Sequence, residues 1–282
     1  MTPNLKTLFG LKFNPFSQDV PTEALLVTPR VDDFGWRLEH GIAAEGGFAM
    51  VTGGHGCGKS TTLRLVFDRL ERLRDVVVAY VDRPQSSVAD FYRELGELFG
   101  VPLRPHNRWA GFRSLREKWI AHIEGTLLRP LLLVDEAQEM HPTVMAELRI
   151  LTQTRFDSRS ILGVVLAGDH RLPQKLERPE LAALGSRVRS RLAVEAASSD
   201  DLRACLRHRM KAAGSPKLMT AELVDTVCDH SLGNYRVLFQ MADELLAHAT
   251  RRKLDVLDEK LYFDVFSHEP RPKTGKPKAR RA

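Results

Sequence analysis

The sequence lacks the features that would place a protein outside the cell or within a membrane. Its 282 residues include only three cysteines, Cys57, Cys205 and Cys228, too few and too scattered for a disulfide framework or a zinc site. It has no run of about eighteen apolar residues, so it predicts no membrane-spanning helix. The N-terminal residues also lack the apolar stretch of a secretory signal. We therefore expect a cytoplasmic protein in a reducing environment.

Acidic residues are missing from the last thirteen residues, 270–282, which carry the whole excess of positive charge. The formal net charge is +6, and the segment 270–282 holds six basic residues and no acid. The whole chain has 42 basic and 36 acidic residues, so the rest of the chain, without those six, has 36 of each. A basic segment rich in proline cannot bury enough apolar surface to fold, so we expect residues 269–282 to be disordered. The tail is either a tether for nucleic-acid phosphates or a solubilising segment, and its composition fits both.

A glycine-rich segment matches the phosphate-loop pattern G-x-x-x-x-G-K-[ST] without a mismatch. An apolar run at 48–51 precedes it, and apolar residues at helical spacing follow it at 61–70, as the pattern requires. Its loop N–H groups and helix start would hold phosphates. Lys59 would reach the β- and γ-phosphates, Ser60 would ligate Mg2+, and Thr61 completes the expected ATP site. The segment consists of Gly53, Gly54, His55, Gly56, Cys57, Gly58, Lys59 and Ser60.

Strands and helices alternate from about residue 48 to residue 195. Five apolar or β-branched runs predict strands, at 48–51, 76–81, 131–134, 161–166 and 192–194. Helical patterns lie between them, at 88–99, 111–127, 142–155 and 173–185. This alternation predicts an α/β fold, with a parallel five-stranded sheet flanked by helices.

After Glu195 the strand-like runs stop, and four helical patterns predict a small α-helical lid domain. These patterns cover 199–213, 219–231, 234–250 and 257–266. We therefore expect four parts in the chain. They are an N-terminal approach segment (1–46), a nucleotide-binding α/β domain (47–195), the helical lid (196–268) and the basic tail (269–282).

Two acidic residues follow the apolar run at 131–134. Asp135 is placed to hold magnesium through its water shell, and Glu136 to polarise the attacking water. The alternative is a solvated acidic turn. A chain that already has a phosphate loop makes this alternative the weaker explanation.

Together these motifs resemble the AAA+ ATPases, and more narrowly the group of secretion ATPases (ExeA) and transposition ATPases (TnsC and TniB). The resemblance covers nearly all of residues 8–266, and its motifs stand in the order of the group. It implies an AAA+ nucleotide-binding domain with the helical lid behind it. The motifs are Phe13-Asn14-Pro15-Phe16, Val134-Asp135-Glu136-Ala137-Gln138, Leu166-Ala167-Gly168, Ser186-Arg187 and Gly233-Asn234-Tyr235-Arg236.

The resemblance also implies roles for four further residues. Asp169 occupies the first sensor position, where similar proteins carry a neutral polar residue. An acid beside phosphates is electrostatically unfavourable unless it is protonated or turned towards magnesium. Arg236 matches the second sensor, which pairs with the phosphates. Arg187 or Arg189 would be the arginine finger that enters the nucleotide site of a neighbouring subunit. The alternatives are a surface arginine at 236 and a solvated basic stripe at 187–191.

Basic, amide and aromatic residues alternate in the segment 104–116. This mixture suits DNA contact through Arg104, Arg108 and Arg113, and the resemblance to transposition ATPases supports it by analogy. The alternative is that the segment packs against the core and turns its basic residues to solvent. A helical stripe of apolar residues supports this alternative: Phe112, Leu115, Trp119 and Ile123.

We therefore expect an AAA+ ATPase that hydrolyses ATP, oligomerises on duplex DNA as a ring or filament, and regulates a transposase. One alternative is a secretion-type, ExeA-like ATPase. Members of that type usually continue into a membrane helix and a cell-wall-binding domain, whereas this chain ends in a basic tail. The other alternative is a DNA-replication loader or adaptor that ATP switches with little turnover.

Overall fold

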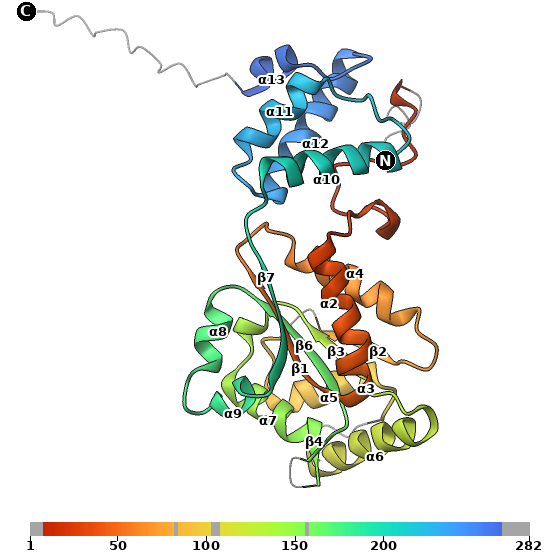
Figure 1. Cartoon of the computed structure of the whole chain (residues 1–282), viewed down its shortest axis with the longest axis vertical. Coiled ribbons are helices and arrows are strands. Elements are labelled where there is room, and N and C mark those ends of the chain that lie inside the picture. The colour runs from red at the N-terminus through yellow and green to blue at the C-terminus, as the bar shows by residue number, and fades with distance from the viewer. Residues whose placement is uncertain (1–7, 82–83, 103–107, 156–157, 267–282) are drawn as a thin grey trace, which may run out of the picture. The chain divides into compact units, whose positions relative to one another are not determined.

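The computed structural model describes residues 8–81, 84–102, 108–155 and 158–266, which form two compact units (Figure 1). The sheet unit consists of the described parts of Pro21–Ala197 together with Asn234–Arg236. The helical unit takes the described parts of Met1–Val20, Ser198–Gly233 and Val237–Ala282. The segment expected to form one approach, 1–46, is thus divided between the two units.

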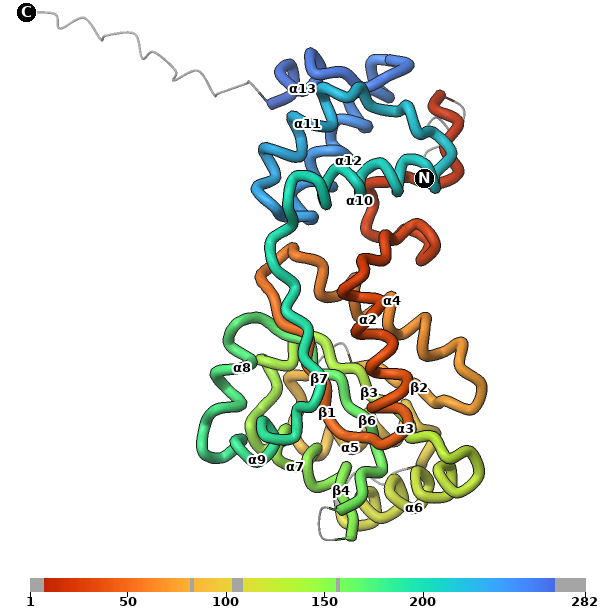
Figure 2. The backbone as a smooth tube through the Cα atoms, in the orientation of Figure 1, coloured from red at the N-terminus to blue at the C-terminus, as the bar shows by residue number. Residues whose placement is uncertain are grey.

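Five parallel strands form the sheet in the order β2-β3-β6-β1-β7, which confirms the predicted α/β fold. Figure 2 shows β1 running between β6 and β7. The strands are β1 (Gly47–Gly53), β2 (Val78–Val81), β3 (Leu131–Val134), β6 (Gly163–Gly168) and β7 (Val188–Val194). β7 begins before the apolar run that predicted it and includes Arg189 and Arg191.

Helices cover both faces of this sheet, and alternate residues of each central strand enter the two cores. Phe48 and Met50 of β1 belong to the core beneath α5–α9, whereas Ala49 and Val51 belong to the core beneath α2, η2, α3 and α4. The helices and short helical turns of the sheet unit are η1 (Thr22–Ala24), α2 (Pro29–Arg37), η2 (Leu38–Ile42), α3 (Ala43–Glu45), α4 (Lys59–Glu71), α5 (Val88–Leu98), α6 (Arg108–Thr126), η3 (Ala137–Glu139), α7 (Pro142–Thr152), α8 (Arg171–Leu176) and α9 (Ala182–Gly185).

The structure answers one question that the sequence left open, the orientation of α6, and adds one element that the sequence did not predict. The stripe on α6 faces the core, because Leu115, Trp119 and Ile123 are buried there with Phe112 packed against them. A two-stranded antiparallel pair, β4 (Gln153–Thr154) and β5 (Arg159–Ser160), was not predicted. Such short, half-buried strands carry no hydrophobic pattern of their own.

The helical unit contains the N-terminal segment, here the described residues up to Val20, and the four predicted helices, the third of which begins with two residues of the sheet unit, Tyr235 and Arg236. The helices are α10 (Ser199–Ala212), α11 (Ala221–His230), α12 (Tyr235–Arg252) and α13 (Glu259–Phe266). Ser198 begins α10 with a capping box closed by Asp201. Along the whole described chain, we find no helix that combines the length and the apolar character needed to cross a bilayer.

Arg209 fastens the N-terminal segment to α10. Its side chain is buried, and Nη1 donates to the carbonyl oxygens of Ser17 at 3.2 Å and Pro15 at 3.4 Å. The guanidinium also lies 3.8 Å from the ring centroid of Phe239. Asn14 adds a hydrogen bond from Nδ2 to Asp243 Oδ1 at 2.6 Å. The Asn-Pro motif near the N-terminus therefore serves packing within the helical unit.

Replacing Arg209 by methionine should destabilise the helical unit. The change keeps much of the apolar contact with Phe239 but leaves the carbonyl groups of Pro15 and Ser17 without this donor, at a cost of about 1–3 kcal/mol. Differential scanning calorimetry measures the loss. Arg207→Met is the matched control, because Arg207 is exposed on the same helix. Equal melting temperatures for the two variants would contradict the assignment.

Candidate nucleotide-binding and catalytic site

The phosphate loop lies between the end of β1 and the start of α4. Lys59 is buried, and its Nζ donates to the Gly54 carbonyl oxygen at 3.0 Å, so the ammonium lies within the loop. The first turn of α4 contains no acidic residue, which leaves its N-terminal field favourable for anions. Gly56 has a φ of +74°, and a Cβ there would come within 2.0 Å of Asn234 Oδ1, so this position requires glycine.

The two expected magnesium ligands, Ser60 and Asp135, lie side by side within the sheet unit. Ser60 Oγ, in the first turn of α4, donates to Asp135 Oδ2 at 2.7 Å. Asp135 follows β3 directly, and its other oxygen, Oδ1, accepts from the Glu136 backbone N–H at 2.9 Å. A hydroxyl and a carboxylate oxygen are the donors that Mg2+ prefers. The residues present therefore fit the cation that accompanies a nucleoside triphosphate.

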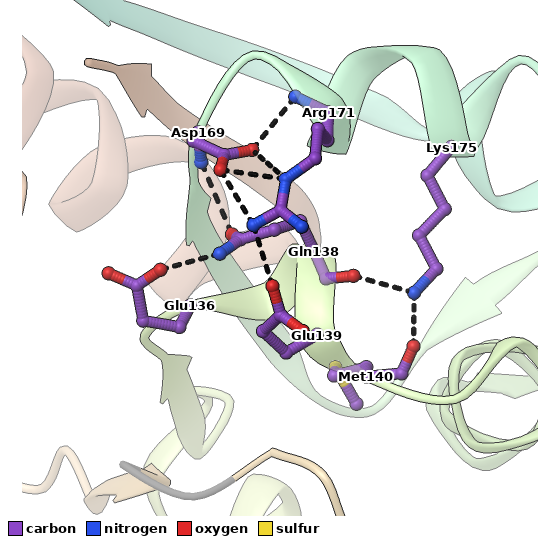
Figure 3. Close-up of polar contacts among 7 residues, drawn as sticks. All are labelled: Glu136, Gln138, Glu139, Met140, Asp169, Arg171 and Lys175. Carbon is purple, nitrogen blue, oxygen red and sulfur yellow. Dashed lines mark hydrogen bonds and ion pairs between the residues drawn. The ribbon is translucent and has the colours of Figure 1, made fainter. Parts of the chain in front are cut away.

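Asp169, at the first sensor position, is held by an arginine two residues further on. The Arg171 backbone N–H donates to Asp169 Oδ1 at 2.8 Å, and its Nε donates to Oδ2 at 2.9 Å (Figure 3). Arg171 Nη2 also pairs with Glu139 Oε1 at 2.6 Å. The hydrogen bonds from the Arg171 side chain lower the pKa of the buried Asp169 carboxyl. The lowered pKa keeps the carboxyl ionised, and the positive charge of Arg171 balances its negative charge.

The second-sensor segment lies on the phosphate loop through Asn234 and Tyr235. Asn234 Nδ2 donates to the His55 carbonyl oxygen at 3.1 Å, and the Tyr235 backbone N–H donates to the Gly56 carbonyl oxygen at 3.0 Å. The Arg236 backbone N–H donates to Asn234 Oδ1 at 2.9 Å, and the Arg236 side chain is exposed. The structure thus places the motif at the loop, with Asn234 as the residue whose side chain contacts it.

Of the two candidate finger arginines, Arg187 lies in the turn between α9 and the edge strand β7, and Arg189 lies near the start of β7. Arg187 Nη1 donates to the Ala183 carbonyl oxygen of α9. Arg189 Nη1 pairs with Glu45 Oε2 at 2.7 Å, and both side chains are more than 60% exposed, at 63% and 68%. An exposed pair of this kind contributes little to stability, so Arg189 can leave it at small cost. Both arginines remain predictions for the finger.

Of the three arginines predicted to contact DNA, only Arg113 has a described side chain. It is exposed on α6 and pairs with Glu117 Oε1 at 3.4 Å. Arg108 begins α6, but its side chain lies outside the description, as does all of Arg104. The tail at 269–282 also lies outside the described residues. DNA contact therefore remains a prediction for these residues.

Three residues near the site were not predicted as site residues. Gln138 and Asn234 lie inside motifs that carried the family resemblance, but no local pattern indicated what they would contact. Arg171 carried no signal except its distance of two residues from an acid that needed a partner. All three act through contacts between distant parts of the sequence or across a turn, which periodicity does not report.

The strand order, the phosphate loop after β1, the acidic pair after β3 and the helical unit define an AAA-type P-loop ATPase. Residues 43–176 match the family model described as an AAA domain. The chain is also 30% identical over 248 residues to general secretion pathway protein A of Aeromonas hydrophila. That alignment covers 86% of this chain and 44% of the relative, so the chain spans less than half of that protein.

Solved structures share the fold at low sequence identity. The Aeropyrum pernix ORC2 protein in its ADP form has a TM-score of 0.71 at 17% identity, over 92% of this chain and 73% of that one. Cdc6p from Pyrobaculum aerophilum has a TM-score of 0.68 at 15% identity, over 86% and 67%. Domain III of Thermotoga maritima DnaA has a TM-score of 0.61 at 18% identity, over 91% and 99%. These similarities support the AAA+ fold.

The pairing of Asp169 with Arg171 predicts a pH-dependent effect of Arg171→Met on stability. The lowered pKa of Asp169 means that its stabilisation is present above the pKa of an unfolded aspartate, about 3.9. That stabilisation is lost as the pH falls through the lower folded value. The variant leaves a buried carboxylate without this partner, so its melting temperature should lie a few degrees below wild type at pH 7.

The difference should shrink as the pH falls below about 5, because protonation removes the unpaired charge in the variant. Thermal melts at pH 7, 5 and 4 measure it, with Arg178→Met as the control at an exposed position. A difference that stays constant over this pH range would contradict the pairing.

Proposed function

We propose that this chain binds ATP with magnesium and hydrolyses it to ADP and phosphate. The observation that carries the proposal is the Ser60–Asp135 hydrogen bond, which brings together the phosphate loop and the acidic strand end. Magnesium bound there would offset the negative charge of the triphosphate. The buried Lys59 ammonium would bind β- and γ-phosphate oxygens, and the N–H groups of the loop would bind the remaining ones.

Glu136 is the proposed base for the attacking water. Its backbone has a φ of +50°, in the left-handed region, and its N–H is bonded to Asp135. A non-glycine residue in this region is uncommon and is kept there by its surroundings. The backbone therefore turns sharply between the proposed magnesium ligand and the proposed base.

We further propose that a second copy of the chain completes the site. Arg187 lies directly before the edge strand β7 of the sheet unit and Arg189 lies within it, where an exposed ion pair holds Arg189. An arginine supplied in trans typically raises turnover about 10³- to 10⁵-fold in comparable phosphoryl-transfer systems. Hydrolysis would therefore depend on assembly as a ring or filament.

For the biological setting, we propose a role in secretion. General secretion pathway protein A is the relative that supports it, although the chain spans only 44% of that protein. The transposase partner expected from the motifs finds no support in the comparisons, and duplex DNA remains an untested partner. Among the readings that the sequence left open, the secretion-type ATPase is thus the better supported.

Glu136→Gln should separate nucleotide binding from hydrolysis. The variant should bind a fluorescent ATP analogue with nearly wild-type affinity, but its turnover should fall about 10²- to 10⁴-fold, the range of a general base. Lys59→Ala should instead lose most of the affinity. Binding titrations and phosphate release measure the two effects, with Glu177→Gln as an exposed control. Wild-type turnover in Glu136→Gln would refute the assignment of the base.

Mixing two inactive variants should test completion of the site by a neighbour. Wild-type turnover per chain should rise with protein concentration, because dilution removes the neighbour. The finger variant, Arg187→Ala or Arg189→Ala, should be inactive alone and regain turnover when mixed with Glu136→Gln, which supplies an intact finger. Arg191→Ala, on the same strand, is the control.

Recovery with one variant identifies the finger, and no recovery with either one rules out both residues. The same assay with duplex DNA bears on the setting. Strong stimulation by DNA would favour a DNA-associated role over the one proposed here.

A further inference from the structure

Gln138 is a buried polar side chain that connects the proposed base to the first sensor position. It lies on η3, and its side chain is among the few buried polar ones of the described residues. Its Nε2 donates to Glu136 Oε2, and its Oε1 accepts from the Asp169 backbone N–H at 3.2 Å (Figure 3). One amide thus joins the turn after β3 to the end of β6.

The chemistry of the two partners fixes the orientation of this amide. The Asp169 backbone N–H can only donate, so the carbonyl oxygen of Gln138 must face it. The Gln138 NH2 group therefore points to Glu136, whose carboxylate only accepts. A flipped amide would set two donors against each other and two acceptors against each other. Neither contact can change without loss of the other.

Two neighbours, Gly168 and Lys175, constrain Gln138 at the tip of its side chain and at its backbone. A Cβ on Gly168 would come within 2.5 Å of Gln138 Oε1, so the end of β6 needs glycine for this approach. Lys175 Nζ donates to the backbone carbonyl oxygen of Gln138 at 2.8 Å and also to that of Met140. These two hydrogen bonds hold the backbone of η3. The Gln138 side chain is therefore held at its tip and at its base.

We propose that Gln138 is the positioning residue for Glu136 in ATP hydrolysis, which rests on the proposed function. Its NH2 group holds the Glu136 carboxylate in the orientation that accepts a proton from the attacking water. Asp169 contributes its backbone N–H to this arrangement, while its carboxylate is occupied by Arg171. The acid at the sensor position therefore acts through Gln138 and does not need to face the phosphates.

Gln138→Glu is the sharpest test, because it keeps the shape of the side chain and an acceptor for Asp169. It removes the donor to Glu136 and sets a carboxylate beside it. We expect kcat to fall at least about 10-fold, part of the effect of the base itself. The KM for ATP and the affinity for a fluorescent ATP analogue should stay within about 3-fold of wild type, because Gln138 does not bind phosphate.

A double-mutant cycle distinguishes positioning from a structural effect. In the Glu136→Gln background, adding Gln138→Glu should change the residual single-turnover rate by less than about 2-fold, because the group on which Gln138 acts is absent. Gln174→Glu makes the same exchange at an exposed position of α8 and should leave every value unchanged. If Gln138→Glu does not fold, Gln138→Asn should show the same loss of kcat alone, because its shorter amide cannot reach both partners.

Three results would overturn the inference: a kcat within about 2-fold of wild type, a matching loss of nucleotide affinity, or an additive loss in the double variant. Each leaves the proposed function intact, because wild type still hydrolyses ATP and Glu136→Gln still hydrolyses it far more slowly. Equal turnover of wild type and Glu136→Gln would refute the proposed function instead, and the role of Gln138 with it.

Discussion

The hydrogen bond between Ser60 and Asp135 is the interaction on which the site depends. It spans 2.7 Å between residues that lie far apart in the sequence, and it exists because β1 and β3 end at the same edge of one parallel sheet. β6 separates the two strands, and its own carboxyl end brings Asp169 to that edge. The strand order thus gathers the phosphate loop, the acidic pair and the sensor position, as open α/β sheets do where they bind ligands.

Much of this arrangement could be predicted because its signals are local. The strands buried on both faces are continuous apolar runs, and the phosphate loop is a contiguous pattern. β7 was placed too late in the chain because it is an edge strand with one exposed face. Its alternating Arg189 and Arg191 resemble a polar stretch more than a strand. The Gln138–Asp169 contact joins two separate turns, and no periodicity in the sequence reports such a pair.

Charge balance explains how an acid can stand at the first sensor position. Beside a triphosphate, a free carboxylate would add electrostatic repulsion. Asp169 instead forms an ion pair with Arg171, which also pairs with Glu139. His55 of the phosphate loop also helps to lower the pKa of Asp169. The position therefore carries a fixed ion pair in place of a neutral side chain. Its backbone N–H donates to Gln138 Oε1 and is the group through which this position contacts Gln138.

The motifs and the overall similarity measure different parts of the molecule. Of the motifs behind the resemblance, those at 134–138, 166–168 and 233–236 lie at the nucleotide site, while Asn14 serves packing in the helical unit. The alignment at 30% identity extends over 248 residues and so includes much of the chain outside these motifs. The motifs therefore bear on the candidate nucleotide site and on packing in the helical unit, whereas the alignment bears on most of the chain.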